Sequence, residues 1–234
     1  VDTDGDGFDD KNELFFNSDP TKSEDTPLTF LIGDSVSEWN GGIQGQDNWT
    51  NGWRNVTADG GGDNYNPRTD FIPFNGGADD GGWNGVQQQW NGNAWDLNTA
   101  GAPPWTFLGS EATHPNGTNN GEEHHTVRRW EAASGEEIDT VTPVAIIWNM
   151  RKSNTNGNGV TGSVHHNGEM IDSLTIAGND TEGSTRIVYA NLSPGDFIDL
   201  AHSPIGTTGT NDGSDSSQNW MRIDTRIPDN HVQP

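Results

Sequence analysis

Residues 159–176, GVTGSVHHNGEMIDSLTI, carry the clearest fold signal in the chain. Residues 159–165 alternate in polarity, as a strand with one buried face does. Asn167-Gly168 is the dipeptide most favoured in a two-residue hairpin turn, because both residues tolerate positive φ. Residues 169–176 then supply the returning strand. The segment therefore predicts a β-hairpin in an antiparallel sheet.

Four more segments of the second half also read as strands: 140–148, 186–192, 197–202 and 218–227. Pro143 lies in the first of them and suggests a sheet edge or a bulge, because proline cannot donate to a ladder. The last segment alternates between two faces, which are Trp220, Arg222, Asp224 and Arg226 on one side and Met221, Ile223, Thr225 and Ile227 on the other. Long helical patterns are missing. We expect an all-β fold, an antiparallel β-sandwich of the jelly-roll type.

The first half of the chain is less regular. Residues 28–32 and 35–39 resemble strands, whereas residues 41–125 form a loop-rich region. Large aromatic residues stand in this region among Gly, Asn and Gln: Trp49, Trp53, Tyr65, Trp83, Trp90, Trp95 and Trp105. Long structured loops on a rigid sandwich usually carry the binding surface.

Composition narrows the partners of the protein. Eleven Lys and Arg residues stand against 35 Asp and Glu residues, which gives a formal charge of −24. A field of this sign repels nucleic acid and anionic membranes. Cysteine is absent, so neither disulfides nor thiol chemistry is expected. The longest apolar run, 141–150, is too short to span a bilayer.

The first thirteen residues have the ligand spacing of a calcium loop. Counted from the first aspartate, carboxylates fall at positions 1, 3, 5, 9 and 12, and a glycine stands at the sharp turn of position 6. We expect one calcium ion to be bound by Asp2, Asp4, Asp6, the carbonyl of Phe8, Asp10 and bidentate Glu13.

Residues 2–25 resemble a thrombospondin type-3 repeat, in which an Asp-x-Asp-x-Asp-Gly loop is followed by a short hydrophobic turn and an Asp-Pro step, here Asp19-Pro20. The resemblance implies a calcium-rigidified spacer of a secreted protein, with a Kd on the order of 10⁻⁴–10⁻³ M. We therefore divide the chain into a spacer, 1–26, and a sandwich domain, 27–234. A chain that opens inside such a repeat is expected to be part of a larger secreted or cell-surface protein.

A second resemblance covers roughly residues 28–227. Its motifs occur in order: Gln44 to Trp53, His114-Pro115, Val127 to Trp130, Asn158 to Val160 with Asn167-Gly168, and Gly195 to Leu200. They resemble a jelly-roll accessory domain of large secreted bacterial proteins, which implies a carbohydrate-binding-module-like function in polysaccharide use. That family usually carries Tyr-Gly-Tyr where this chain has Asn51-Gly52-Trp53-Arg54.

The residues themselves also suit a sugar ligand. Exposed indoles stack on the C–H faces of pyranose rings, and amide, carboxylate and guanidinium groups bind the hydroxyls. Most of these Trp side chains are expected to fill a core that is poor in Leu and Ile. The candidate ligand contacts are Trp49, Trp53, Trp83 and Trp90, with Gln46 and Arg54 as polar partners. The ligand is expected to be a neutral polysaccharide.

An enzyme and an adhesion module with a protein partner remain alternatives. A jelly-roll lyase needs a His or Tyr base near an Arg or Gln, and a retaining glycosidase needs two carboxylates about 5 Å apart. No such set can be paired from the sequence, whose candidates are His114, His124, His125, His165, His166, His202, Glu122, Glu123, Arg128, Arg129 and Tyr189. We therefore expect no catalysis.

The remaining polar clusters have structural interpretations. The adjacent histidine pairs 124–125 and 165–166 would point to opposite faces of a strand, which disfavours a shared metal. Surface positions are expected for the histidines. Arg128-Arg129-Trp130 predicts a core Trp and one Arg paired with a carboxylate. Asp63, Asp212 and Asp215 lie in Gly-rich loops that could hold a further calcium ion.

Overall fold

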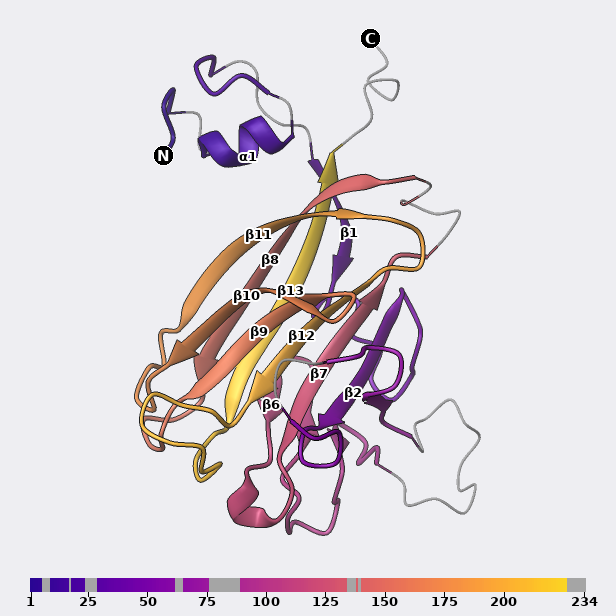
Figure 1. Cartoon of the computed structure of the whole chain (residues 1–234), viewed down its shortest axis with the longest axis vertical. Coiled ribbons are helices and arrows are strands. Elements are labelled where there is room, and N and C mark those ends of the chain that lie inside the picture. The colour runs from indigo at the N-terminus through magenta and orange to yellow at the C-terminus, as the bar shows by residue number, and fades with distance from the viewer. Residues whose placement is uncertain are drawn as a thin grey trace.

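The computed structural model describes residues 1–5, 9–16, 18–23, 29–61, 65–75, 89–133, 138 and 140–226. Within these ranges two antiparallel sheets pack face to face, which confirms the predicted all-β sandwich (Figure 1). No helix in the described ranges is long and apolar enough to cross a bilayer.

The elements follow one another along the chain in this order: α1 (Asp10–Phe15), β1 (Thr29–Asp34), β2 (Trp49–Asn55), β3 (Phe71–Pro73), β4 (Trp95–Asp96), β5 (Phe107–Leu108), β6 (Ala112–His114), the 3-10 helix η1 (Thr118–Asn120), β7 (His124–Glu131), β8 (Thr142–Lys152), β9 (Val160–His166), β10 (Glu169–Ile176), β11 (Ser184–Leu192), β12 (Phe197–Ser203) and β13 (Ser217–Arg226).

Sheet A has the strand order β11-β8-β13-β6-β5-β4, and β1 pairs with the other half of the long strand β13. Sheet B has the order β10-β9-β12-β7-β2-β3. The predicted hairpin joins β9 to β10, and its turn residues Asn167 and Gly168 have φ values of 51° and 90°. Positive φ at both positions is what a type I′ turn requires.

Two strand expectations are wrong. β8 lies between β11 and β13 rather than at an edge, and Pro143 stands near its first residue, where a missing N–H costs little. Residues 35–38 form a turn instead of the strand expected at 35–39. The Asp34 carboxylate accepts hydrogen bonds from the backbone N–H groups of Val36 and Ser37, which folds the chain back locally.

The core lies between the sheets. Its largest side chains include Trp130 and Trp148, and the predicted inward face of β13 supplies Met221 and Ile223. The indole of Trp148 packs over Gly162 of β9, where any side chain would collide with the ring. A second cluster around Phe74, Trp95 and Leu108 closes the end of the sandwich near β4 and β5. Of the nine Trp side chains that the structure describes, four are buried and three more pack against the second cluster, so most of them fill cores, as expected.

The N-terminal segment lies at the end of the sandwich where β13 ends (Figure 1). It contains α1, which was not predicted; the Asp9 side chain caps it by accepting from the N–H of Asn12. The segment contacts the sandwich through Phe15 and Phe16, whose rings lie 4.7 and 6.5 Å from that of Tyr189 on β11. Phe16 is 1% exposed. The described part of the spacer therefore packs against the sandwich.

Candidate ligand-binding site

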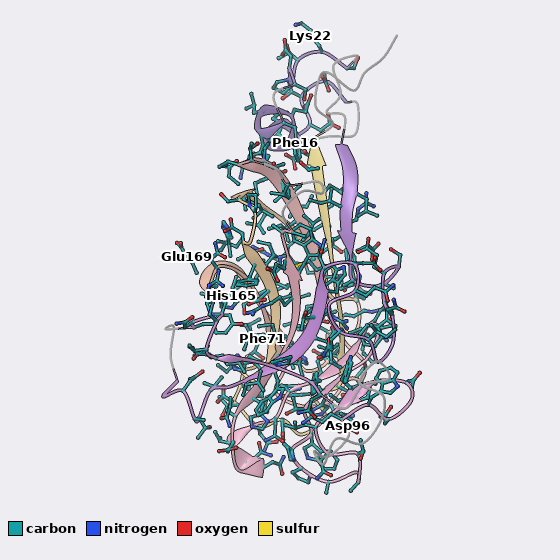
Figure 2. The ribbon with its side chains drawn as sticks, turned by 90° about the vertical axis from the view of Figure 1, so that its right-hand side faces the viewer. Phe16, Lys22, Phe71, Asp96, His165 and Glu169 are labelled. Carbon is teal, nitrogen blue, oxygen red and sulfur yellow. The ribbon has the colours of Figure 1, made fainter. Side chains whose placement is uncertain are left out.

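The outer face of sheet B carries a groove of about 430 Å³. It lies between the end marked by Phe16 and the end marked by Asp96, at the level of His165 (Figure 2). Strands β2, β7, β9, β10 and β12, with the segments after β2 and β12 and the residue before β7, supply its lining residues: Arg54, Val56, Gly61, Glu123, His125, Thr161, Ser163, His165, Met170, Ser173, Ser203 and Ile205. We call it the sheet B groove.

Strand alternation selects the side chains that face the groove. Val160 and Val164 of β9 point into the core, so Thr161, Ser163 and His165 point outward. The register with β10 places Ser173 beside Ser163, and Met170 beside His165. Hydroxyl groups therefore line one side of the groove, and a thioether lies next to an imidazole.

The two imidazoles of the groove have local partners. His125 Nε2 lies 2.9 Å from Glu123 Oε1, and His165 Nε2 lies 2.9 Å from Ser163 Oγ. Burial lowers the pKa of His165 below its ordinary value, because the charged ring would lose solvation. His165 is therefore neutral at pH 7 and can either donate to or accept from a hydroxyl.

Arg54 lines the groove, but its guanidinium is already engaged. Its Nε donates to Asp59 Oδ2 at 2.6 Å, and its Cζ lies 5.2 Å from the centre of the Tyr65 ring. The side chain is buried. The predicted role of Arg54 as a hydroxyl partner would require part of this pairing to open.

A buried network fixes the loop beside the groove. Arg129 donates to both oxygens of Asp199 at 2.7 Å, to the hydroxyl of Tyr65 at 3.0 Å and to the carbonyl of Pro67 at 2.8 Å. Its guanidinium also lies 3.9 Å from the centre of the Phe71 ring. The network holds residues 65–71 against β7 and β12. With Trp130 in the core, this confirms the structural interpretation of Arg128-Arg129-Trp130.

A second hollow, of about 200 Å³, lies where the chain turns from β4 to β5. The indole of Trp105 is 39% exposed there. Its lining residues are Asp96, Asn98, Gly101, Trp105, Phe107, His114 and Ser216. The side-chain amide of Asn98 donates to the carbonyl of Pro103, and the backbone N–H of Trp105 donates to Asn116 Oδ1, so both sides of the hollow are fixed. We call it the Trp105 hollow.

The three predicted Trp contacts that the structure describes are not brought together in either site. Trp49 is 5% exposed and its Nε1 donates to Glu38, so it is a core residue and not a stacking plane. Trp53 packs on His124 with ring centres 4.4 Å apart. Trp90 is half-buried against Trp95.

The other two predicted contacts add little to the site. Trp83 lies outside the described residues. Gln46 is exposed and contacts Trp49 through the backbone, since its carbonyl accepts from the Trp49 N–H. Sequence reasoning missed Trp105 as a contact, although it lay in the loop region and follows two prolines, a pattern typical of an exposed loop.

The histidines divide differently from the expectation. His124 and His202 are buried and face the core, because β7 and β12 turn these positions inward. Full burial among other cationic groups lowers the pKa of His202 well below its ordinary value. The expected opposite orientation of adjacent histidines is confirmed for His124 and His125, since only His125 faces the groove.

Asp212 and Asp215 lie in a cluster that contains its own cation. The buried ammonium of Lys152 lies 3.4 Å from Asp215 Oδ1 and donates to the carbonyl of Ser214. Asp212 accepts from the side-chain amides of Asn119 and Asn120. Burial raises the pKa of Asp215 to about 7. The ammonium of Lys152 thus takes the place of the calcium ion that was considered for this loop. Asp63 lies outside the described residues.

The predicted calcium ligands are placed only in part. Asp2 accepts from the Gly5 N–H at 2.7 Å, Asp10 accepts from the N–H and hydroxyl of Thr3, and Glu13 is fully buried. Asp4 is half-buried. Asp6 and the Phe8 carbonyl lie outside the described residues. Among the residues that the structure describes, no group of three acidic or imidazole side chains is arranged to hold a metal ion.

No protein-family model and no curated protein matches the chain. Solved structures give distant matches. A family 35 carbohydrate-binding module from Clostridium thermocellum aligns with 16% identity and a TM-score of 0.28, covering 42% of this chain and 69% of its own. The C-terminal family 6 module of a marine laminarinase from Zobellia galactanivorans has 14% identity, a TM-score of 0.28, and coverages of 48% and 89%.

A family 51 module from Clostridium perfringens, solved with methyl-galactose, aligns with 10% identity and a TM-score of 0.32, covering 60% of this chain and 83% of its own. Similarity at these identities and TM-scores establishes neither a family nor a ligand for this chain.

Proposed function

We propose that the protein is a non-catalytic carbohydrate-binding module of a secreted or cell-surface bacterial protein, and that it binds a neutral polysaccharide at the Trp105 hollow. The observation that carries the proposal is the indole of Trp105, 39% exposed beside a carboxylate and an amide. These are the two kinds of group that a pyranose needs, a flat apolar surface and planar hydrogen-bonding partners.

Trp105 supplies the stacking surface in this proposal. Each Å² of apolar surface that the sugar covers contributes about 25 cal/mol, and ordering costs offset part of the gain. Asp96 and Asn98 bind the hydroxyls at the edge of the same ring. The half-buried Trp90 borders a separate, shallow depression with Asn91 and Thr99. A chain of sugars long enough to occupy both hollows would meet both indoles.

The charge of the protein supports a neutral ligand. The formal net charge is −24, and Asp96 adds a carboxylate within the hollow itself. An anionic glycan would be repelled at low salt, whereas a neutral one is insensitive to this field.

The test is affinity electrophoresis in gels that contain laminarin, mannan, xylan or alginate. We expect a neutral glycan to retard the wild type, Trp105→Phe to keep part of the retardation, and Trp105→Ala to lose most of it. Trp220→Ala is the matched control, because Trp220 on β13 is also partly exposed but is not among the lining residues of the hollow. Retardation by alginate alone, or equal retardation of all variants by neutral glycans, would refute the proposal.

The lack of catalysis is part of the same proposal. A lyase in the sheet B groove would pair His125 or His165 with Arg54, but Asp59 already binds that guanidinium. Release of reducing ends or unsaturated products from any of these glycans, abolished by His125→Ala, would overturn this part.

We also propose that the spacer binds one calcium ion through Asp2, Asp4, Asp6, Asp10, Glu13 and the carbonyl of Phe8. Carboxylate and carbonyl oxygens are the donors that calcium prefers, and the proposed set has the loop spacing of a calcium site. Titration calorimetry should show one site in the wild type and none in Asp4→Ala. An unchanged stoichiometry in the variant would exclude the assignment.

A further inference from the structure

We infer that the sheet B groove is a second ligand site, separate from the Trp105 hollow, which takes a neutral saccharide bearing a methyl group, such as a 6-deoxyhexose or an acetylated sugar. The inference rests on the lining of the groove and does not require that the Trp105 hollow binds sugar.

The apolar side chains of the groove are unusually open to solvent. Met170 on β10 is 54% exposed and Ile205, after β12, is 44% exposed, and Val56 lies with them in the lining. A volume of about 430 Å³ is within the range of pockets that hold a small ligand. Apolar side chains exposed within a concave site gain free energy when an apolar group covers them.

The polar groups of the groove suit hydroxyls rather than charges. Ser163 and the neutral His165 form a hydroxyl–imidazole pair in which either group can change from donor to acceptor. Arg54 is paired with Asp59, and His125 lies beside the carboxylate of Glu123. Among the lining residues that the structure describes, the groove therefore offers no unpaired positive charge that would favour a sulfate or a uronate.

The mode of binding differs from that of the Trp105 hollow. No aromatic ring of Trp, Tyr or Phe stands among the lining residues that the structure describes, so the face of a pyranose has no flat partner. The apolar contacts are instead a thioether and a branched aliphatic group, which suit a compact methyl substituent. The sugar hydroxyls would then meet Ser163 and His165.

Methionine methyl signals in NMR test the inference directly. The chain has three methionines; Met150 and Met221 are fully buried, so they serve as internal controls for Met170. With ¹³C-methyl-labelled protein, L-fucose should shift the Met170 signal alone. L-galactose, which differs only by a hydroxyl at C6, should bind about fourfold more weakly, the factor that about 0.8 kcal/mol for one buried methyl group gives. The Met170 shifts caused by N-acetylglucosamine and by glucose, compared in the same way, test whether the groove prefers an acetylated sugar.

Two variants separate the sites. Ile205→Gln keeps the reporter and should abolish the preference for the methylated sugar, while Trp105→Ala should leave that preference intact. The inference fails if no sugar shifts Met170, if matched sugars bind equally, or if Trp105→Ala removes the Met170 shift. If the Trp105 hollow binds no polysaccharide but the sheet B groove binds the methylated sugar, the Met170 response would be unchanged.

Discussion

Replacement of Arg129 by methionine should destabilise the fold far more than removal of any surface cation. The guanidinium makes four hydrogen bonds, two of them to Asp199, which is 1% exposed. Arg129→Met would leave this carboxylate buried without its counter-charge. Such a loss costs about 3–5 kcal/mol of unfolding free energy.

The matched control is Lys22→Met. Lys22 also binds an aspartate, Asp19, at 2.7 Å, but both side chains are exposed, by 57% and 36%. An exposed pair contributes little to stability, so this variant should unfold almost as the wild type does. Urea unfolding followed by tryptophan fluorescence measures both values by linear extrapolation.

The double variant Arg129→Met/Asp199→Leu sharpens the test. It removes both charges together, and an apolar pair of similar volume is close to neutral. The double variant should therefore be more stable than Arg129→Met alone. If Arg129→Met costs no more than Lys22→Met, or if the cost of the double variant equals the summed costs of Arg129→Met and Asp199→Leu, the uncompensated charge is not the cause.

Three further predictions concern other parts of the fold. Asp215→Asn should gain stability relative to the wild type as pH rises from about 4 to 7. Burial raises the pKa of Asp215 to about 7, so in this range the folded wild type keeps a proton that the unfolded chain has lost, and the stability of the wild type falls as pH rises. A difference in thermal unfolding that does not change with pH would contradict this. Gly52→Ala should cost about 1–3 kcal/mol in urea unfolding, because its Cβ would lie 2.5 Å from the carbonyl oxygen of Ile72 in β3; an effect below 0.5 kcal/mol would disprove the close approach. Phe16→Ala should release the N-terminal segment and so lower the pKa of Tyr189, which burial and Asp9 raise to about 12. Tyrosinate absorbance at high pH should report Tyr189 alone, because burial raises the pKa of the other tyrosine, Tyr65, still further. An unchanged Tyr189 titration would show that Phe16 does not hold the segment.

The sequence was most informative where local chemistry determines structure. The Asn167-Gly168 turn and the alternation of β13 predicted both the strands and their buried faces, because positive φ and period-two polarity are local properties. Pro143 misled because its place in the sheet depends on which strand pairs beside β8, a non-local fact. The turn at 35–38 depended on a single carboxylate, Asp34, and polarity patterns do not detect such a contact.

The candidate sites were harder to predict for the same reason. Trp49 and Trp105 both stand in the loop-rich region of the sequence, yet one is in the core and the other is 39% exposed. The sheet B groove combines residues from five strands, so no single stretch of sequence contains it. Sequence reasoning therefore predicted a class of ligand from residue types but could not select the residues that line a hollow.

The use of cations inside the sandwich has a consequence for its surface. Arg54, Arg128, Arg129 and Lys152 are buried, so four of the eleven basic residues are withdrawn from the exterior. The outer shell therefore has few positive charges with which to balance its carboxylates locally, and mobile counterions must take that role. Self-repulsion of this kind weakens as the Debye length falls from about 30 Å at 0.01 M salt to about 10 Å at 0.1 M. The melting temperature should accordingly rise with sodium chloride over this range, as it does for proteins adapted to brine; a flat salt profile would show that the carboxylates are too far apart to interact.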